Sequence, residues 1–319
     1  SVVNLKTIGT LVQHYMSDSS IILNGSNVNE WHDVSGFVNL AEQSVANSQP
    51  VLIADVLNDY PAVRFDGIDD KLLINTGDTL GTMFLVANWN GAITFPDYNG
   101  LINQQTSTII FDGQIGTSQL LLSFSPYFGN NIYINNTQTN DFSPMNRYKI
   151  ISGVNSNPQF IENFVIGNDR DQSRFWNGDV LEIIMFKNAI NPSEIDIVYE
   201  YLRQKYAPLV NLGEDINIPY GFCDTAIITA DKPWFIDYMW SNGAITPTIS
   251  VDETGIYSVT VTDIFGFTSV DSIYVNYPAY SLTDTTICLG DTIVLYTGLG
   301  EDYDFLWSDS SNDTILTVW

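Results

Sequence analysis

The stretch PAVRFDGIDDKLLI, residues 61–74, places three aspartates between two apolar runs. The runs AVRF and KLLI are short and rich in bulky residues, as strands are, and Gly67 permits a tight turn between them. The carboxylates of Asp66, Asp69 and Asp70 can accept hydrogen bonds from backbone N–H groups of such a turn. The stretch therefore predicts two adjacent strands joined by a hairpin.

Two other interpretations of the same aspartates remain open. Clustered carboxylate oxygens are the ligands that a hard cation such as calcium prefers, so Asp66, Asp69 and Asp70 are candidate metal ligands. A catalytic pair is less favoured, because the neighbouring residues Asp69 and Asp70 would point to opposite faces of a strand.

Length and composition indicate a folded protein of two or three domains. The chain has 319 residues, of which 45% are hydrophobic and 15% charged, which favours packed cores over disorder. No apolar run approaches the roughly 18 residues of a membrane helix. The chain begins with Ser1 and carries no recognisable signal peptide, so we expect a segment of a longer, processed protein.

The net charge of −26 is unevenly distributed. Residues 1–208 hold 10 basic and 21 acidic residues (10 − 21 = −11), and residues 209–319 hold 1 basic and 16 acidic residues (1 − 16 = −15). Such a surface repels phosphate backbones and anionic membranes, so we expect neither nucleic-acid binding nor membrane insertion. Acidity suits divalent cations and neutral ligands such as glycans.

The cysteines and histidines exclude several kinds of site. Cys223 and Cys288 are too few for a disulfide-built scaffold or a cysteine-rich zinc site. His14 and His32 are the only histidines, and their spacing does not match a helical metal-binding pair.

Residues 1–208 are predicted to form short strands separated by Gly, Asn and Asp turns, which indicates an all-β sandwich of antiparallel sheets. The expected strands include AVRF, KLLI, TMFLVANW, STIIF, QLLLSF, NIYIN, YKIISGV, NFVIG and DVLEIIMF. One helix is predicted at residues 191–206, with Asn191 as its N-cap, Pro192 at its first position and Glu194 completing a capping box. Its apolar stripe is Ile195, Val198 and Leu202.

Residues 209–319 contain a repeat and no helical pattern. Trp240 in MWSNG and Trp307 in LWSDS are 67 residues apart, and Cys223 and Cys288 are 65 apart. The first copy closes with the alternating segment GIYSVTVTDIFGFTSVDSIYVNY, and the second stops before the equivalent segment. A repeat of this length with short strands and a central Trp fits an immunoglobulin-like sandwich.

The repeat resembles the Ig-like modules of very long secreted proteins from Bacteroidetes. The residues that carry the resemblance are Cys288, Gly290, Asp291, Trp240, Ser241, Gly243, Gly255, Tyr257, Val259, Val261 and Asp263. The family often has a second cysteine where this chain has Phe267, after Gly266. The resemblance therefore implies that Cys223 has no partner within its domain, and that any partner of Cys288 lies beyond Trp319.

The N-terminal part resembles LamG-like domains, which have a concanavalin A-type jelly roll. Three blocks in the expected order carry the resemblance: EWHDVSG (30–36), PAVRFDGIDDKLLI (61–74) and WNGDVLEIIMFKNAINPSEIDIVYEYLRQKY (176–206). The resemblance implies a jelly roll over residues 1–208, an Ig-like domain over 209–278 and a truncated second one over 279–319. LamG-like domains often bind glycans or proteins, but their fold implies no single activity.

A second candidate calcium site lies in NDRDQS, residues 168–173. Asp169, Asp171 and Ser173 have the alternating oxygens of a calcium loop, and this site is the better of the two candidates. The pattern then departs from such a loop, because Arg174 replaces the usual glycine and Val180 replaces the usual glutamate. The alternative is an acidic loop neutralised by Arg170 and Arg174. Calcium is the one cofactor that the sequence indicates.

Aromatic residues in turn-rich segments are candidates for sugar binding, because exposed rings stack on the CH faces of sugars. The candidates are Trp89, Phe95, Tyr98, Tyr127 and Phe128. The alternative is that they belong to the core, as aromatic residues often do. Trp176 is expected in the core, and Trp240 and Trp307 are expected at the centres of the Ig-like sandwiches.

Asp-Thr and Asp-Ser pairs recur in the Ig-like region and resemble the O-glycosylation signal of Bacteroidetes surface proteins. The hydroxyls concerned are those of Thr225, Ser272, Thr285, Thr292 and Thr314. The alternative is the ordinary composition of strand starts.

The sequence does not favour an enzyme. The segment EIDIVYE (194–200) resembles a glycosidase motif, but it falls on the predicted helix, where Glu194 and Asp196 diverge by about 200°.

The leading hypothesis is a segment of a large secreted adhesin at the outer surface of the cell, whose LamG-like domain binds a glycan or surface and whose repeats form a stalk. By resemblance, such proteins use the type IX secretion machinery and serve attachment or gliding motility. The alternatives are a purely structural stalk and the non-catalytic binding region of a large secreted polysaccharide-degrading enzyme.

Overall fold

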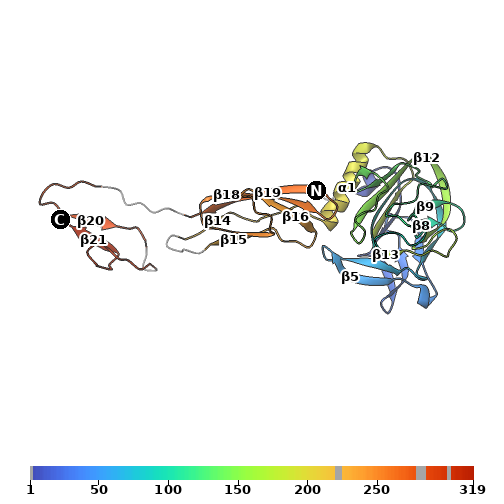
Figure 1. Cartoon of the computed structure of the whole chain (residues 1–319), viewed down its shortest axis with the longest axis horizontal. Helices are drawn as coiled ribbons and strands as arrows, with labels where there is room; N and C mark the ends of the chain where they lie inside the picture. The colour runs from blue at the N-terminus through green and yellow to red at the C-terminus, as the bar shows by residue number, and fades with distance from the viewer. Residues whose placement is uncertain (1–2, 220–224, 278–284, 300–302) are drawn as a thin grey trace. The chain divides into compact units, whose positions relative to one another are not determined.

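The computed structural model describes residues 3–219, 225–277, 285–299 and 303–319 (Figure 1). The described residues form many strands and one α-helix, which confirms the all-β prediction. They divide into two compact units. Unit 1 comprises Ser1–Val210, Asp231–Tyr238 and Val261–Ser269, and unit 2 comprises Asn211–Ala230, Met239–Thr260 and Val270–Trp319. The predicted domain limits near residues 208 and 278 stay predictions.

The elements of residues 3–210 follow one another in a simple order. They are η1 (Leu5–Thr7), β1 (Leu11–Met16), β2 (Ile21–Asn24), β3 (Asn27–His32), β4 (Leu40–Glu42), η2 (Ala46–Ser48), β5 (Val51–Leu57), β6 (Tyr60–Asp66), β7 (Leu72–Trp89), β8 (Gly100–Gln104), β9 (Ile109–Asp112), β10 (Ile132–Ile134), β11 (Thr137–Gln138), β12 (Lys149–Ile166), β13 (Asn177–Phe186) and α1 (Pro192–Tyr206).

Six of these strands close a circuit of antiparallel pairings. β13 pairs with β6, β6 with β5, β5 with β3, β3 with β4 and β4 with β7, and β7 pairs back onto β13. β1 extends the arrangement from β13, while β12 extends it from β7 and carries β8 and β10. The jelly-roll order of strands remains a prediction.

The predicted hairpin at residues 61–74 is wrong. β13 lies between β6 and β7, because Gly178 pairs with Phe65 of β6 on one side and with Trp89 of β7 on the other. Residues 67–71 therefore connect two strands that flank a third. The turn chemistry is as expected, with Gly67 at φ +77° and a Cβ at that position only 2.7 Å from Cβ of Asn177. Turn residues fix a local reversal, whereas burial of β13 decides which strands pair.

Five of the predicted strands differ in extent from the observed ones. KLLI and TMFLVANW are parts of one 18-residue strand, β7, and YKIISGV and NFVIG are parts of one 18-residue strand, β12. The segment QLLLSF forms only isolated bridges at Gln119 and Leu120. Its extended course ends at Phe124 and Ser125, which adopt φ values of +61° and +53°.

The middle of β7 is buried on both faces, which explains its continuous apolar run. Met83, Leu85 and Ala87 point into an inner core that also holds Trp31, Phe65 and Trp176. Phe84 and Val86 point the other way, into a helix-side core that holds Val198 and Leu202 of α1. The period-2 alternation of a strand thus supplies both cores from one segment.

Helix α1, yellow in Figure 1, begins as the sequence predicts. Asn191 accepts a hydrogen bond from the Glu194 backbone, and the Glu194 carboxylate accepts one from the Asn191 backbone, which completes the capping box. Val198 and Leu202 are buried and Ile195 packs at the margin of the helix-side core. Arg203, further along α1, donates to Asp263 Oδ2 over 2.7 Å within unit 1.

A buried carboxylate, Glu182 of β13, lies beneath α1. It is fully buried and accepts hydrogen bonds from Lys205 Nζ (2.9 Å), Tyr201 Oη (2.8 Å) and Tyr206 Oη (2.8 Å), and its other near neighbour is His14 Nε2 at 2.6 Å. Burial alone would raise the pKa of Glu182, but the hydrogen bond from His14 and the charge of Lys205 outweigh it, so the pKa lies below its usual value. The network joins β1, β13 and α1.

Unit 2 shows the predicted repeat in its strand pairings. Its elements are β14 (Ile216–Asn217), β15 (Ala226–Thr229), β17 (Thr248–Val251), β20 (Ile293–Tyr296) and β21 (Ile315–Val318), and β16 (Phe235–Trp240), β18 (Gly255–Asp263) and β19 (Thr268–Asn276) lie partly in it. Ala226 pairs with Val251, and Ile293 pairs with Val318, each member 67 positions later.

The tryptophans repeat the same geometry. Trp240 Nε1 donates to the carbonyl of Thr246, and Trp307 Nε1 donates to that of Asp313, the equivalent position. Trp240 is buried, as the sequence predicts, and Trp307 is half-buried. The Ig-like assignment of either copy stays a prediction.

We expect Glu182→Gln to lower the free energy of unfolding by about 3 kcal/mol at pH 7.5, because the substitution removes the closer anion of the largely buried Lys205 and leaves only Asp18, which is more exposed and 3.4 Å away. The pKa of Glu182 is lowered by folding, so its contribution exists above the unfolded pKa of about 4.3 and disappears as the pH falls through the folded value. The difference between the two chains should therefore shrink in acid. Urea unfolding from pH 3 to 8 measures it.

The matched control is Glu162→Gln, which removes the same charge from an exposed position of β12. We expect it to change the free energy of unfolding by less than about 0.5 kcal/mol. Equal effects of the two substitutions would contradict the role given to Glu182.

Candidate functional site

A pocket of about 120 Å³ brings together residues from four segments of unit 1. Strand β9 contributes Ile109 and Asp112, and the connections that precede β8, follow β9 and precede β13 contribute the rest. The lining residues are Tyr98, Ile109, Asp112, Leu121, Phe124, Asp169, Arg170 and Arg174. Two of the sequence candidates, Tyr98 and Asp169, thus meet in one place although 71 positions separate them.

Backbone pairings hold the connections around the pocket. Gly100 N donates to the carbonyl of Arg174 (3.2 Å), and Gly100 and Asn168 each form a bridge with Phe175. A Cβ at Gly100 would lie 2.1 Å from the backbone nitrogen of Asp169, so only glycine permits this close approach. The buried side chain of Asn103 adds a further link, donating to the carbonyl of Asn168 (3.0 Å).

Two aromatic rings form one wall of the pocket. Tyr98 and Phe124 meet edge to face with 6.2 Å between ring centroids, and Phe124 is 66% exposed. The guanidinium of Arg174 lies over the Tyr98 ring at 5.4 Å, which fixes one face of that ring. The wall therefore offers apolar ring surface beside charged groups.

Asp112 is the buried carboxyl of the pocket. Its Oδ1 accepts a hydrogen bond from Asn103 Nδ2 (2.5 Å), and its Oδ2 accepts none from the residues that the structure describes. Burial raises the pKa of Asp112 to about 7, with the charge of Asp169 adding to the rise and the Asn103 hydrogen bond opposing it. Asp112 therefore changes charge near neutral pH.

The predicted calcium loop at residues 168–173 contains ion pairs. Asp169 Oδ1 accepts from the backbone N–H groups of Ser173 and Arg174, and its Oδ2 pairs with Arg174 Nε at 2.8 Å. Asp171 pairs with the same guanidinium. These contacts fit the alternative of an acidic loop neutralised by arginine, and calcium at Asp169, Asp171 and Ser173 stays a prediction.

Asp112 and Asp169 line one pocket and differ in environment, which is also the arrangement of a glycosidase pair. The oxygens of Asp169 already accept two backbone N–H groups and the Arg174 guanidinium. A nucleophile or general base needs a free lone pair aimed at the reacting atom. The contacts of Asp169 therefore occupy it within its own loop.

Three of the five aromatic candidates are not available to a ligand. Trp89, Phe95 and Phe128 are buried in the inner core, so the expectation that they present exposed rings is wrong. Trp89 packs against Phe95 and against Trp176, which is buried as predicted. Aromatic rings in turn-rich segments can still enter a core, because the free energy gained by burying their apolar area outweighs the tendency of turn residues to lie at the surface.

Tyr127 is half-buried and serves the fold. Its hydroxyl donates to the carbonyl of Leu80 over 2.5 Å and accepts from the backbone N–H of Gln159 over 2.8 Å. Its ring packs against the inner core. Of the five candidates, only Tyr98 therefore lines the pocket.

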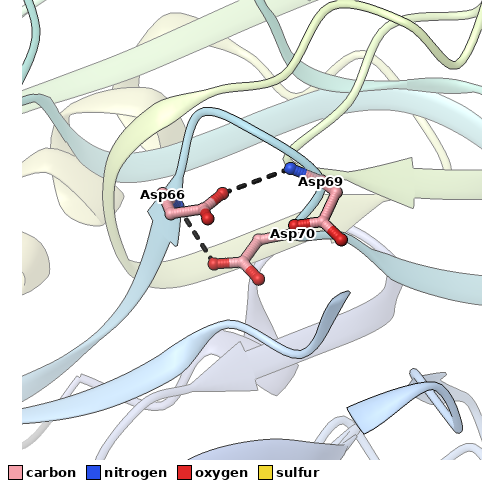
Figure 2. Close-up of side chains that lie close together, drawn as sticks. All are labelled: Asp66, Asp69 and Asp70. Atoms are coloured by element: carbon pink, nitrogen blue, oxygen red, sulfur yellow. Dashed lines mark hydrogen bonds between the residues drawn. The ribbon is translucent and has the colours of Figure 1, made fainter. Parts of the chain in front are cut away.

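The second cluster of carboxylates is the one at the turn after β6. Figure 2 shows Asp66, Asp69 and Asp70 close together, with one oxygen of each lying within 4.8 Å of the others. Asp66 Oδ1 accepts from the backbone N–H groups of Ile68 and Asp69, and Asp70 Oδ2 accepts from that of Asp66. The turn role is thus filled, and calcium at this cluster stays a prediction.

Burial raises the pKa of Asp70 to about 6, and the charges of Asp66 and Asp69 add to the rise. Asp69 Oδ2 accepts a hydrogen bond from Ser48 Oγ (2.9 Å). These three carboxylates repel one another when all are ionised.

The candidate glycosylation sites of the repeat region are accessible. Thr225, Ser272, Thr285 and Thr292 are exposed, and Thr314 is half-exposed. Cys288 is an exposed free thiol, and Cys223 lies outside the described residues.

Neither known family models nor curated proteins match this chain. Among the described residues, no helix is long and apolar enough to span a membrane.

Sequence reasoning missed Phe124 and Asp112. Phe124 is the last residue of the predicted strand QLLLSF, so it has the pattern of a strand although Tyr127 and Phe128 follow closely. Asp112 ends the apolar run STIIF, and a carboxylate directly after a buried strand was the available signal.

We expect Asp70→Asn to stabilise the protein by about 1 kcal/mol at pH 8 in EDTA, because it removes a buried charge and keeps an oxygen for the Asp66 N–H. A carboxyl whose pKa is raised by folding costs stability as the pH rises from about 4 through about 6, so the gain should vanish near pH 4. Urea unfolding at both pH values measures the difference.

Millimolar calcium is the decisive addition to this experiment. If it stabilises the natural chain at pH 8 but not the variant, the three aspartates hold the ion. Equal stability of both chains at pH 8 in EDTA would contradict the repulsion inferred among them.

Proposed function

We propose that this chain is a segment of a secreted adhesin whose first unit binds a glycan in the pocket between Tyr98, Phe124 and Asp112. The supporting observation is the convergence in one pocket of the exposed Phe124 ring beside the half-buried Tyr98, a carboxyl with an unengaged oxygen and the guanidinium of Arg170. Sugars offer apolar CH faces for the rings and hydroxyl groups that donate to carboxylates and accept from guanidinium groups.

The size of the pocket supports a small contact point. A volume of about 120 Å³ holds about four waters at ~30 Å³ each, well below the usual volume of a pocket for a drug-sized ligand. The fit is to one sugar ring, so strength of attachment would come from many copies of the protein on one surface. Multivalent weak contacts suit adhesion better than transport or catalysis.

A second candidate function is that of a stalk module. The recurrence of the β15–β17 pairing in β20–β21 after 67 residues favours it for the C-terminal part. The strong negative charge of residues 209–319 would keep such repeats soluble and apart. In the proposed adhesin the two functions belong to different parts of the chain, at the outer surface of the cell and after type IX secretion.

We expect Phe124→Ala to lower binding of the 319-residue chain to its polysaccharide about fivefold, because a stacked ring contributes about 1 kcal/mol. Phe160→Ala is the matched control, since Phe160 of β12 is also 66% exposed and does not line the pocket. Binding is measured on a broad polysaccharide array with calcium and with EDTA.

Retained binding in Phe124→Ala would place the ligand elsewhere on the chain. Failure of the unaltered chain to bind any polysaccharide under either condition would leave the stalk as the better account.

We also expect the chain from its native source to be heavier than the bare polypeptide, with sugar on hydroxyls of the repeat region. Intact mass followed by peptide mapping tests this. A mass equal to that of the polypeptide would reject glycosylation at all five residues.

A further inference from the structure

We infer that the pocket takes one ring of an uncharged sugar chain and that Asp112 excludes sugars bearing a carboxylate. The inference rests on the proposed function, because it concerns the ligand class of the same site. It follows from which charged groups around the pocket are already paired and which are not.

The two arginines of the pocket are not equivalent. The guanidinium of Arg174 is engaged by Asp169 and Asp171 and lies over the Tyr98 ring. Arg170 has one weak hydrogen bond to the carbonyl of Ser107 at 3.4 Å. Arg170 is therefore the guanidinium with N–H groups to offer to a ligand oxygen.

The two carboxyls of the pocket, Asp112 and Asp169, also differ in whether they are already paired. Asp169 is held by backbone N–H groups and by Arg174, whereas Oδ2 of Asp112 accepts no hydrogen bond from the described residues. The pocket thus presents one acceptor, Asp112, and one donor, Arg170. A sugar hydroxyl satisfies both, because it donates through its hydrogen and accepts through its oxygen.

A carboxylate on the ligand would fail at Asp112. The ligand could pair with Arg170, but its charge would then lie beside Asp112, whose Oδ2 has no partner among the described residues, whereas Asp169 is already paired with Arg174. The field of a chain with net charge −26 opposes it as well. Like charges placed together in a desolvated site are strongly unfavourable, whereas a neutral hydroxyl carries no such cost.

The small volume of the pocket, about 120 Å³, suits one ring of the ligand, and neighbouring rings would lie outside it. The exposed Phe124 ring at the wall is then free to stack on the ring that enters.

The test uses methyl glycosides in matched pairs: gluco, galacto and manno rings, each with a hydroxymethyl group or with a carboxylate in its place. Dissociation constants are measured by ligand-observed NMR titration with the 319-residue chain at pH 8, where Asp112 is ionised because its pKa is about 7. We expect at least one neutral glycoside to bind about tenfold or more tightly than its acidic counterpart.

The discriminating variant is Asp112→Asn, which keeps the shape and removes the charge. It should fold, because burial already favours the neutral carboxyl. We expect the preference for the neutral ring to fall below about threefold. The matched control is Asp55→Asn, an exposed position of β5 with φ +52° that suits asparagine, and it should keep the preference.

Lowering the pH to 5.5 gives an independent readout. Asp112 is protonated there, while Asp169, Arg170 and Arg174 are the other charged groups that act on it. The preference of the unaltered chain should shrink, and that of Asp112→Asn should not change.

The outcomes separate the inference from the proposed function. Equal or tighter binding of an acidic glycoside, or an unchanged preference in Asp112→Asn, overturns the inference and leaves glycan binding standing. Binding to a polysaccharide array without binding to any methyl glycoside overturns the single-ring fit alone. Failure to bind both the array and the glycosides overturns the proposed function and the inference together.

Discussion

The fold of the first unit depends on burying one carboxylate, Glu182, beneath helix α1. Glu182 is fully buried and is satisfied from β1 by His14 and from α1 by Tyr201, Lys205 and Tyr206. Such a charge is tolerable only when every partner is in place, because an unpaired buried charge is far more costly than an unmade contact between neutral groups. The network therefore fixes how α1 lies on β13. The apolar residues around it stabilise the contact between the two elements, but they do not set the position of one along the other.

With α1 fixed, β13 becomes the strand on which the rest of the unit is organised. It pairs with β1, β6 and β7, and its two faces enter different cores. A second buried carboxylate of the same strand, Asp179, is held by Arg64, Tyr148 and Asn90. The connections that build the pocket begin and end on strands of this arrangement, which is why loops without regular structure hold a defined site.

The candidate site was only partly readable in the sequence. Tyr98 and Asp169 attracted attention for separate reasons, as a sugar-stacking ring and as a calcium ligand. Their meeting depends on the pairing of β8 with β12 and on the close approach at Gly100, both of which join distant parts of the chain. Asp112 and Phe124 gave weaker signals, because the exposure of a side chain at a strand end is decided by what packs over it. Trp89, Phe95 and Phe128 show the opposite error, since turn composition around a ring does not keep it out of a core.

The sequence by itself determined the local elements and their periodicities. The capping box at Asn191 and Glu194, the helix to Tyr206 and the 67-residue repeat follow from short-range hydrogen-bond chemistry and from repetition, which need no tertiary information. Only the tertiary structure decided that β13 separates β6 from β7, that KLLI and TMFLVANW are one strand, and that Arg174 neutralises Asp169. The first is a choice among strands far apart in the chain, which burial over the whole core decides and no single stretch of sequence contains. The other two are local, but the sequence alone does not show whether a strand is interrupted or which of several nearby charges pair.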